Sequence, residues 1–325
     1  MKDSFDRKID YMRISVTDRC NLRCRYCMPE GTEKVPMREI LSYEEMLLAA
    51  EAAASLGISR FKVTGGEPLV RKGVTGFLAD LKKVPGVSEV TLTTNGTLLM
   101  SNLSDIKAAG VSGINISLDT MKPERFKEIT GTEGLRDVLD GIQAALDSNI
   151  PIKINTVLLE GVNQDEWRDI IGFAERYPVA VRFIEMMPIG YGRDFSPVKN
   201  SDILKEIKAL YPGSTEDTGV RGNGPAVYIK PPGFSGSIGF ISPVSSPFCS
   251  SCNRIRLTSM GKIKPCLCYG DTVDLKPILR EKEGEERRAL LREAIEKAIR
   301  LKPEAHCFDK KEGVTEGSKM VSIGG

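Results

Sequence analysis

The chain has 325 residues, which is enough for one large domain or for two of ordinary size. Its 46 Lys and Arg residues nearly balance its 44 Asp and Glu residues, so the bulk charge does not indicate binding to nucleic acid or to an anionic membrane. A polyanionic ligand would therefore have to be held by a local cluster of Arg and Lys side chains.

The N-terminal segment, residues 1–18, is charged, and no part of the sequence approaches 18 consecutive apolar residues. We therefore expect neither a signal peptide nor a membrane span, and a cytoplasmic location where thiols stay reduced. The eight cysteines are then more typical of metal ligands than of disulfides. His306 is the only histidine, which excludes a site built mainly from imidazole.

Strand-like and helix-like segments alternate along the first part of the chain. Short β-rich runs predict strands at 11–16, 60–65, 89–96, 113–119, 152–161 and 180–187. Amphipathic segments such as 42–57 and 134–149 lie between most of them, and Ser42 with Glu45 forms a capping box. This alternation predicts a parallel sheet. Six units are fewer than the eight of a closed barrel, so we expect an open, partial barrel with its active site at the carboxyl ends of the strands.

The loops after these strands carry the unusual residues. The first predicted strand is followed by three cysteines in the order C-x3-C-x2-C, Cys20, Cys24 and Cys27. The second is followed by Gly-Gly-Glu-Pro at 65–68. An iron–sulfur cluster normally takes four thiolates, so a [4Fe–4S] cluster on three would keep one iron open to a substrate or cofactor. A zinc knuckle or a disulfide framework is the alternative for these residues.

Beyond residue 212 the pattern changes to Gly- and Pro-rich loops and short β-like runs, followed by a charged helix at about 284–301. We therefore divide the chain into a partial βα barrel, 1–212, and a C-terminal α+β extension, 213–325, that closes the open side of the barrel. The extension contains a second group of cysteines in the order C-x2-C-x13-C-x-C, namely Cys249, Cys252, Cys266 and Cys268. Three of them could hold a second cluster, and all four could instead make a closed zinc site.

The motif C-x3-C-x2-C, with Gly-Gly-Glu-Pro after the second strand, resembles the radical S-adenosylmethionine (SAM) superfamily. The sequences "RISVTDRCNLRCRYCMP", "RFIEMMPIG", "CNRIRLT" and "SIGG" resemble, within it, the GTP 3′,8-cyclase family of molybdenum cofactor biosynthesis, and this match runs from about residue 8 to the end. The resemblance implies bound SAM and two [4Fe–4S] clusters, one on Cys20, Cys24 and Cys27 and one on Cys249, Cys252 and Cys266.

The same resemblance implies a reaction. The second cluster would offer its open iron to the guanine base of GTP, and a 5′-deoxyadenosyl radical would remove hydrogen from ribose C3′. The carbon radical would then attack C8 to give (8S)-3′,8-cyclo-GTP. The resemblance also implies three sets of site residues: for SAM, Tyr26, Gly66, Ser117 and Met187; for GTP, Arg13, Lys62, Thr93, Lys153, Arg182, Arg254 and Arg256; and for the radical step, the terminal residues Gly324 and Gly325.

Outside the resemblance these residues would attract less attention, since a Ser or Met at a strand end is often packed and Lys and Arg are usually solvated. Arg254 and Arg256 are exceptions, because alternation with Ile255 and Leu257 puts both on one face of a strand. The chain also departs from the family pattern. It has Arg60 and Lys62 where Lys-x-Arg is common, and Lys319 where Arg is usual in the tail.

The expected partners are GTP, a one-electron donor of the flavodoxin or ferredoxin type, and a cyclic pyranopterin monophosphate synthase that receives the product. We expect no nucleic acid and no membrane, and a monomer or a homodimer. Two other classes stay open. One is a radical SAM enzyme that modifies peptides with an auxiliary cluster, and the other is a non-catalytic iron–sulfur or zinc protein.

Overall fold

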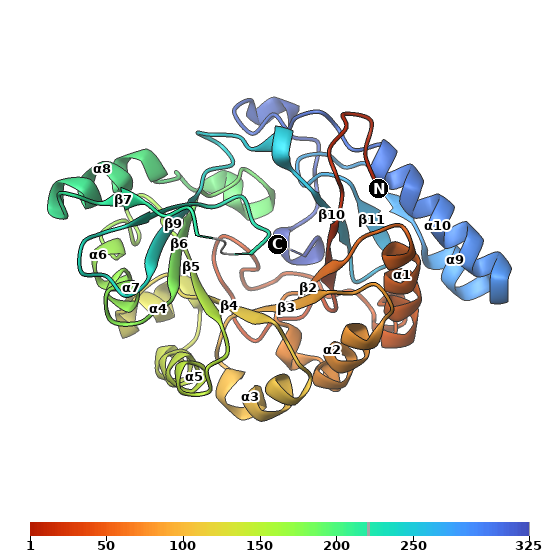
Figure 1. Ribbon diagram of the computed structural model, residues 1–325, viewed down its shortest axis with the longest axis horizontal. Helices are drawn as coiled ribbons and strands as arrows, with labels where there is room; N and C mark the ends of the chain where they lie inside the picture. The colour runs from red at the N-terminus through yellow and green to blue at the C-terminus, as the bar shows by residue number, and fades with distance from the viewer. Residues whose placement is uncertain (220–221, 325) are drawn as a thin grey trace.

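The fold is described from a computed structural model, which covers residues 1–219 and 222–324. A sheet of 12 strands curves into an open barrel, in the order β12-β11-β10-β1-β2-β3-β4-β5-β6-β9-β8-β7 (Figure 1). The strands are β1 (Tyr11–Ser15), β2 (Arg60–Thr64), β3 (Glu89–Thr94), β4 (Gly113–Ser117), β5 (Ile152–Val157), β6 (Ala180–Ile184), β7 (Thr215–Glu216), β8 (Val227–Lys230), β9 (Ser237–Ile241), β10 (Arg254–Leu257), β11 (Lys262–Lys264) and β12 (Val273–Asp274).

Helices cover the outside of this sheet (Figure 1). They are α1 (Tyr43–Ser55), α2 (Val74–Lys83), α3 (Leu99–Ala108), α4 (Pro123–Thr130), α5 (Leu135–Asp147), α6 (Trp167–Ile170), α7 (Gly172–Arg176), α8 (Asn200–Leu210), α9 (Lys276–Glu281) and α10 (Gly284–Arg300). The capping box predicted at Ser42 is present, since its side chain accepts the Glu45 N–H and the Glu45 carboxylate accepts the Ser42 N–H. No helix of the described residues is both long enough and apolar enough to cross a membrane.

The six parallel strands predicted from the sequence are confirmed as β1 to β6. The C-terminal extension builds on both edges of this unit. β10 pairs in parallel with β1, and β9 pairs in parallel with β6. Edge strands present unpaired N–H and C=O groups, which these two strands satisfy. Strands on both sides of residue 212 thus belong to one sheet, and the division of the chain into two domains there stays a prediction.

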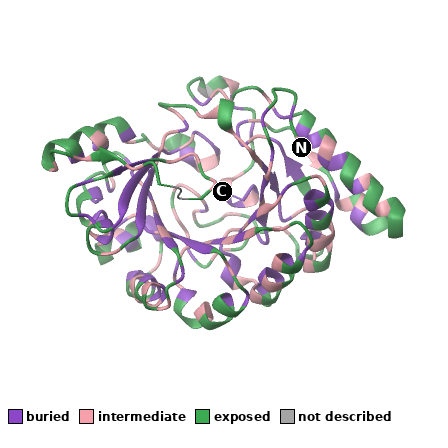
Figure 2. Ribbon diagram, in the orientation of Figure 1, coloured by how far each residue is buried: buried purple, intermediate pink, exposed green. Residues whose placement is uncertain are grey.

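Period-two alternation separates an apolar outer face of the barrel from a polar inner face. Met12 and Ile14 of β1, and Phe61 and Val63 of β2, are fully buried in the core between sheet and helices. Figure 2 shows the strands largely buried and the outer sides of the helices exposed. The residues that alternate with these core residues along each strand point to the inside of the barrel. The inner face of the barrel therefore carries the side chains that can meet a ligand.

Candidate active site

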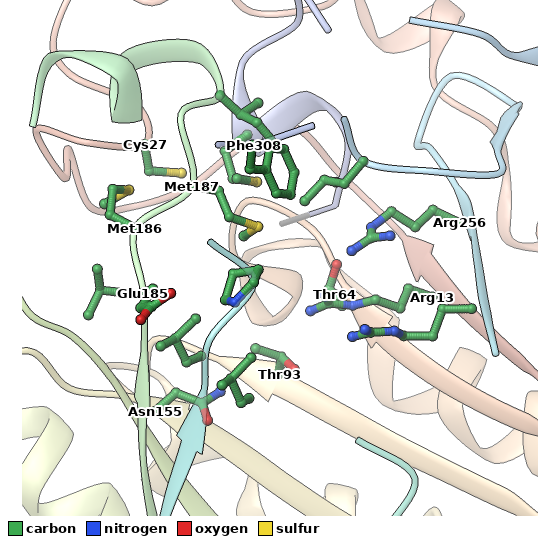
Figure 3. A pocket seen from close by; sticks show the side chains of 18 of the residues that line it. Arg13, Cys27, Thr64, Thr93, Asn155, Glu185, Met186, Met187, Arg256 and Phe308 are labelled. Atoms are coloured by element: carbon green, nitrogen blue, oxygen red, sulfur yellow. The ribbon is translucent and has the colours of Figure 1, made fainter. Parts of the chain in front are cut away.

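A cavity of about 340 Å³ lies inside the barrel (Figure 3). Figure 3 shows Arg13 and Arg256 reaching into it from one wall and Met186 and Met187 from the opposite one. Its lining includes all six cysteines predicted as cluster ligands, Cys20, Cys24, Cys27, Cys249, Cys252 and Cys266. Because β10 runs parallel to β1, the cysteines after β1 and those before β10 lie at opposite ends of the strands. The cavity therefore joins two cysteine triads.

The first triad lies on the loop after β1. The backbone turns back on itself there, with the Cys27 N–H donating to Cys24 O at 3.0 Å. Burial, with the neighbouring Cys27 and Asp119, raises the pKa of Cys24 well above its usual value, and burial with Cys20 raises the pKa of Cys27 to about 12. Thiols that oppose each other's ionisation become thiolates when a metal centre supplies positive charge. These three residues thus suit an iron–sulfur cluster.

The second triad lies on loops from distant parts of the chain. Cys249 and Cys252 precede β10, and Cys266 follows β11. Burial opposes ionisation of Cys252, but the charges of Arg254 and Lys302 outweigh it and lower the pKa of this thiol to about 6. A preformed thiolate is the species that binds iron. The donor set of this triad therefore also suits a cluster.

Two cationic side chains that were not among the predicted site residues link the loops around the second triad. Lys302 Nζ donates to Arg254 O at 2.9 Å and to Pro265 O at 2.8 Å. The Arg7 guanidinium donates to Cys249 O at 2.9 Å and to the carbonyls of Pro303 and Glu304. Both side chains tie the chain ends to the loops of the second triad. No pattern in the sequence indicated these contacts. Arg7 and Cys249, for example, are more than 240 positions apart in the chain.

Cys268 is not among the residues that line the cavity with the second triad. Its buried side chain packs in a small apolar cluster with Phe308 and Val314, and its Sγ is 3.5 Å from Cys307 Sγ. Within the described residues, no three Cys, His, Asp or Glu side chains are arranged to hold one metal ion. Cys268 is thus separate from the cavity lining that the other three cysteines share, and the choice between the three-cysteine set and the closed zinc site stays a prediction.

Basic residues line the barrel between the triads. Arg13 is in register with Lys62 of β2 on one side and with Arg256 of β10 on the other. Burial and the charges of Arg182, Arg13 and Lys153 lower the pKa of Lys62 well below its usual value. The same causes, burial and neighbouring arginines, lower the pKa of Arg256 to about 9. An anion in the cavity would relieve this repulsion.

The predicted GTP residues divide into two groups. Four of them line the cavity, namely Arg13, Thr93, Arg254 and Arg256. The other three, Lys62, Lys153 and Arg182, are outside the lining but belong to the same cluster of charges. Arg182 donates hydrogen bonds to Asn155 and Asn115, which fix its guanidinium on the inner face of the sheet.

The predicted SAM residues come together beside the first triad. Tyr26, Gly66, Ser117 and Met187 all line the cavity. A Cβ at Gly66 would lie 2.4 Å from Arg19 O, so only glycine allows the chain to pass so close. Tyr26 Oη donates to Asp119 Oδ2 at 2.6 Å. Burial raises the pKa of Asp119 to about 6, despite the hydrogen bonds from Tyr26 and the Val157 N–H. Asp119 was not among the predicted site residues.

The C-terminal tail reaches this end of the cavity. Val321 lines the cavity, and its Cγ2 would lie 3.0 Å from a Cβ at Gly66. Val321 and Ile323 are buried and anchor the tail. Gly324 has a φ of +71° and lies against Ser15 and Thr64 at the ends of β1 and β2. Gly325 lies outside the described residues.

Comparison with known proteins agrees with this geometry. The radical SAM superfamily pattern matches residues 14–174, and the pattern named Molybdenum Cofactor Synthesis C matches residues 179–308. A GTP 3′,8-cyclase of Clostridium perfringens (strain SM101 / Type A) is 45% identical over the full length of both chains. The chain belongs to the GTP 3′,8-cyclase family. A relative of the same name from Heliobacterium modesticaldum is 44% identical over the full length of both chains.

Solved structures of lower similarity support the fold of this cyclase family member. The crystal structure of Streptococcus suis SuiB bound to S-adenosylmethionine matches with a TM-score of 0.61, over 97% of this chain and 73% of that one. SuiB bound to its precursor peptide SuiA matches with a TM-score of 0.62, over 97% and 72%. Sequence identity is 13% and 11%, so the likeness concerns the fold alone.

Proposed function

We propose that this chain is a radical SAM lyase that converts GTP to (8S)-3′,8-cyclo-7,8-dihydroguanosine 5′-triphosphate, the first step of molybdenum cofactor biosynthesis. The observation that carries this proposal is one cavity that joins two cysteine triads and has Arg13, Arg254 and Arg256 on the wall between them. The full-length identity of 45% to a protein named GTP 3′,8-cyclase supports it.

Each triad would hold a [4Fe–4S] cluster with one iron free of protein ligands. When bound, the first cluster and SAM supply the 5′-deoxyadenosyl radical, and the second cluster supplies an open iron for the guanine base. The protein residues do the remaining work. Tyr26, Gly66, Ser117 and Met187 would hold SAM against the first triad, and the barrel wall would keep water from the reacting carbon.

The cationic inner face would bind the triphosphate. Arginine forms paired hydrogen bonds with phosphate oxygens, and Arg13, Arg254 and Arg256 line the cavity on neighbouring strands. Lys62, Lys153 and Arg182 would add charge from behind them, and Thr93 would add a hydroxyl. Binding would thus place the ribose between the two triads, where C3′ can meet the radical.

The tail would complete the site from the other side. Gly324 lies against Ser15 and Thr64, close to the first triad. We infer that Gly324 and Gly325 position the substrate radical through backbone groups or the terminal carboxylate. The remaining expectations also form part of the proposal. They are a cytoplasmic location, a flavodoxin- or ferredoxin-type electron donor, product transfer to a cyclic pyranopterin monophosphate synthase, and a monomeric or homodimeric state.

An isotope experiment tests the reaction. Anaerobically reconstituted protein is mixed with SAM, a strong reductant and GTP carrying deuterium at ribose C3′. The proposal predicts GTP-dependent formation of 5′-deoxyadenosine that contains the deuterium, because the radical must take that hydrogen. Deuterium retained in the nucleotide would refute the assignment. Formation of 5′-deoxyadenosine that depends on a peptide and not on GTP would indicate the peptide-modifying class.

A further inference from the structure

Two cysteines outside the cavity lining, Cys268 and Cys307, lie in contact with each other. Their Sγ atoms are 3.5 Å apart, and the Cys307 N–H donates to Cys268 Sγ, also at 3.5 Å. Cys268 lies between β11 and β12, whereas Cys307 lies after α10. The proposed reaction uses neither of them. Two thiols in contact are the arrangement from which a disulfide forms.

The backbone holds both cysteines in place. The Glu316 N–H donates to Cys268 O at 3.1 Å, and the Lys310 N–H donates to Cys307 O at 2.9 Å. Because the two sulfurs already touch, small rotations of the side chains bring them to bonding distance. The fold thus brings together two thiols that are 39 positions apart in the chain.

Gly313 leaves the space that the Cys307 thiol fills. A Cβ at this position would lie 2.8 Å from Cys307 Sγ, a distance that forces one of the two atoms to move. The φ angle of Gly313 is not in the left-handed region, so the backbone conformation does not require glycine there. The close approach of the thiol does. Gly317, by contrast, has no atom within 4 Å of its Cβ position.

We propose that Cys268 and Cys307 form a reversible disulfide, with an oxidised low-molecular-weight thiol such as glutathione disulfide as the oxidant. Cys307 is partly exposed and Cys268 is buried, so Cys307 reacts first. Its thiolate attacks one sulfur of the small disulfide and releases one small thiol. Cys268 then attacks Cys307 Sγ and releases the second small thiol. The two released thiols carry the hydrogens that the protein loses, and a reducing compartment reverses both steps.

The disulfide braces the second triad. Cys268 lies two residues after Cys266, and Cys307 directly follows His306, whose backbone N–H donates to Cys249 Sγ at 3.4 Å. A covalent bond between Cys268 and Cys307 therefore joins two sides of the triad and restricts local opening of its loops. This consequence rests on the proposed function, which places a cluster at the second triad. The disulfide itself does not depend on the cluster.

Mass spectrometry tests the disulfide. Anaerobically reconstituted protein is incubated with glutathione disulfide, its remaining thiols are alkylated, and it is digested without reduction. The wild type should yield a linked peptide pair, Cys268 with Cys307, that dithiothreitol separates. Cys307→Ser should leave the buried Cys268 free of glutathione, and Cys268→Ser should leave Cys307 as its mixed disulfide with glutathione. A wild type in which Cys307 carries only glutathione, or in which neither cysteine reacts, would overturn the proposal.

Two glycine variants test whether the fold positions the thiol. Gly313→Ala should slow cross-linking severalfold, because the added methyl group displaces Cys307 Sγ from its contact with Cys268. Gly317→Ala adds the same methyl group in open space and should cross-link at the wild-type rate. Equal rates in all three proteins would contradict a thiol pair that the fold holds in position.

Iron release tests the brace. It is measured with an iron chelator in protein whose first triad is replaced by alanine, so that the second cluster is the only one. The cross-linked form should release iron severalfold more slowly than the reduced form, and addition of Cys268→Ser should abolish the difference. Equal rates would refute the brace. Protein that gives the linked peptides but binds no iron at the second triad would refute the proposed function instead, and stoichiometric zinc without linked peptides would assign Cys268 to the closed zinc site.

Discussion

Burial removes most of the water from the Arg256 guanidinium, and Arg13 and Arg254 lie close enough to repel it, so its pKa falls to about 9. Its Nε is buried and has no hydrogen-bond partner among the described residues. Such an arrangement destabilises the ligand-free protein and is retained where charge is needed for function. At the scale of single residues, the site is therefore prepared for an anion.

Arg256→Met should separate binding from stability. The variant should bind GTP roughly 10- to 100-fold more weakly, because a charge-assisted hydrogen bond contributes about 1.5–3 kcal/mol. Without nucleotide its thermal stability should equal or exceed that of the wild type, because the repulsion within the cluster is reduced. Calorimetric titration and thermal unfolding measure the two quantities. Arg288→Met on the exposed face of α10 is the control and should alter neither. Unchanged GTP affinity would place the basic cluster outside the binding site.

Glu67 of the Gly-Gly-Glu-Pro turn should produce a pH-dependent stability. Burial raises its pKa to about 7, even though its carboxylate accepts the N–H groups of Leu69 and Asn95 and the Thr94 hydroxyl. The folded protein then holds a proton that the unfolded chain releases between pH 4.5 and about 7. The free energy of unfolding should therefore fall as the pH rises through this window, by up to about 3 kcal/mol.

Denaturant unfolding at pH 5 and pH 8 checks this expectation against Glu67→Gln, which cannot titrate. The stability difference between wild type and variant should be larger at pH 5 than at pH 8. A difference that does not change with pH would show that Glu67 is ionised throughout.

At the scale of elements, the sequence predicts best what depends on neighbouring residues. Alternation along β1 to β6, and the capping box at Ser42, are local and are confirmed. The pairing of β10 with β1 was not predicted, because it joins residues more than 240 positions apart. The orientation of Cys268 was also open from the sequence. It depends on packing against Phe308 and Val314, which the Cys-Leu-Cys spacing does not reveal.

Strand β11 shows how one element connects the second triad to the tail. Lys264 is in register with Arg256 and lies two residues before Cys266. Its ammonium forms an ion pair with Glu316, and both side chains are 2% exposed. The Glu316 carboxylate also accepts the Ser318 N–H at 2.6 Å. The pair thus fixes the chain a few residues before the tail enters the cavity.

Removing one partner of this ion pair should lower the free energy of unfolding markedly, whereas replacing both partners with apolar residues should lower it little. Lys264→Met leaves Glu316 buried without its partner and should lower the free energy of unfolding by about 3–5 kcal/mol. The double variant Lys264→Met with Glu316→Leu should recover most of this loss. Denaturant unfolding measures both. Lys282→Met, which breaks an exposed ion pair with Glu286, is the control and should cost less than about 1 kcal/mol. Equal losses in the single and double variants would contradict this account.

At the scale of the whole molecule, both chain ends converge on one cavity. The N-terminal segment contributes Arg7 to the second triad, and the C-terminal tail places Gly324 at the first. The family resemblance implied a role for the tail, whereas nothing in the sequence indicated Arg7. Residues that connect distant segments are thus the hardest to predict from the sequence, because their spacing follows no local period.

The triads should each account for one cluster. Replacing Cys20, Cys24 and Cys27 together with Ala, or Cys249, Cys252 and Cys266 together, should halve the iron content of reconstituted protein. Replacing Cys268 and Cys307, whose sulfur atoms lie 3.5 Å apart outside the cavity lining, should leave the iron content unchanged. Iron and acid-labile sulfide analysis measures these amounts. A stoichiometric zinc content with iron for only one cluster would favour the four-cysteine zinc site after all.

Removal of the last two residues should uncouple radical formation from cyclisation. The anchors Val321 and Ile323 are buried and stay in place, so folding, both clusters and GTP binding should change little. The groups that Gly324 brings to Ser15 and Thr64 are lost, and cyclised product should fall by roughly 10- to 100-fold, as for other losses of positioning. Formation of 5′-deoxyadenosine should persist. Product and 5′-deoxyadenosine are quantified in the same reaction.

A second variant with two alanines added after Gly325 should show the same uncoupling, because added bulk obstructs a narrow site. Wild-type rates of cyclisation in the truncated protein would show that the tail takes no part in the reaction.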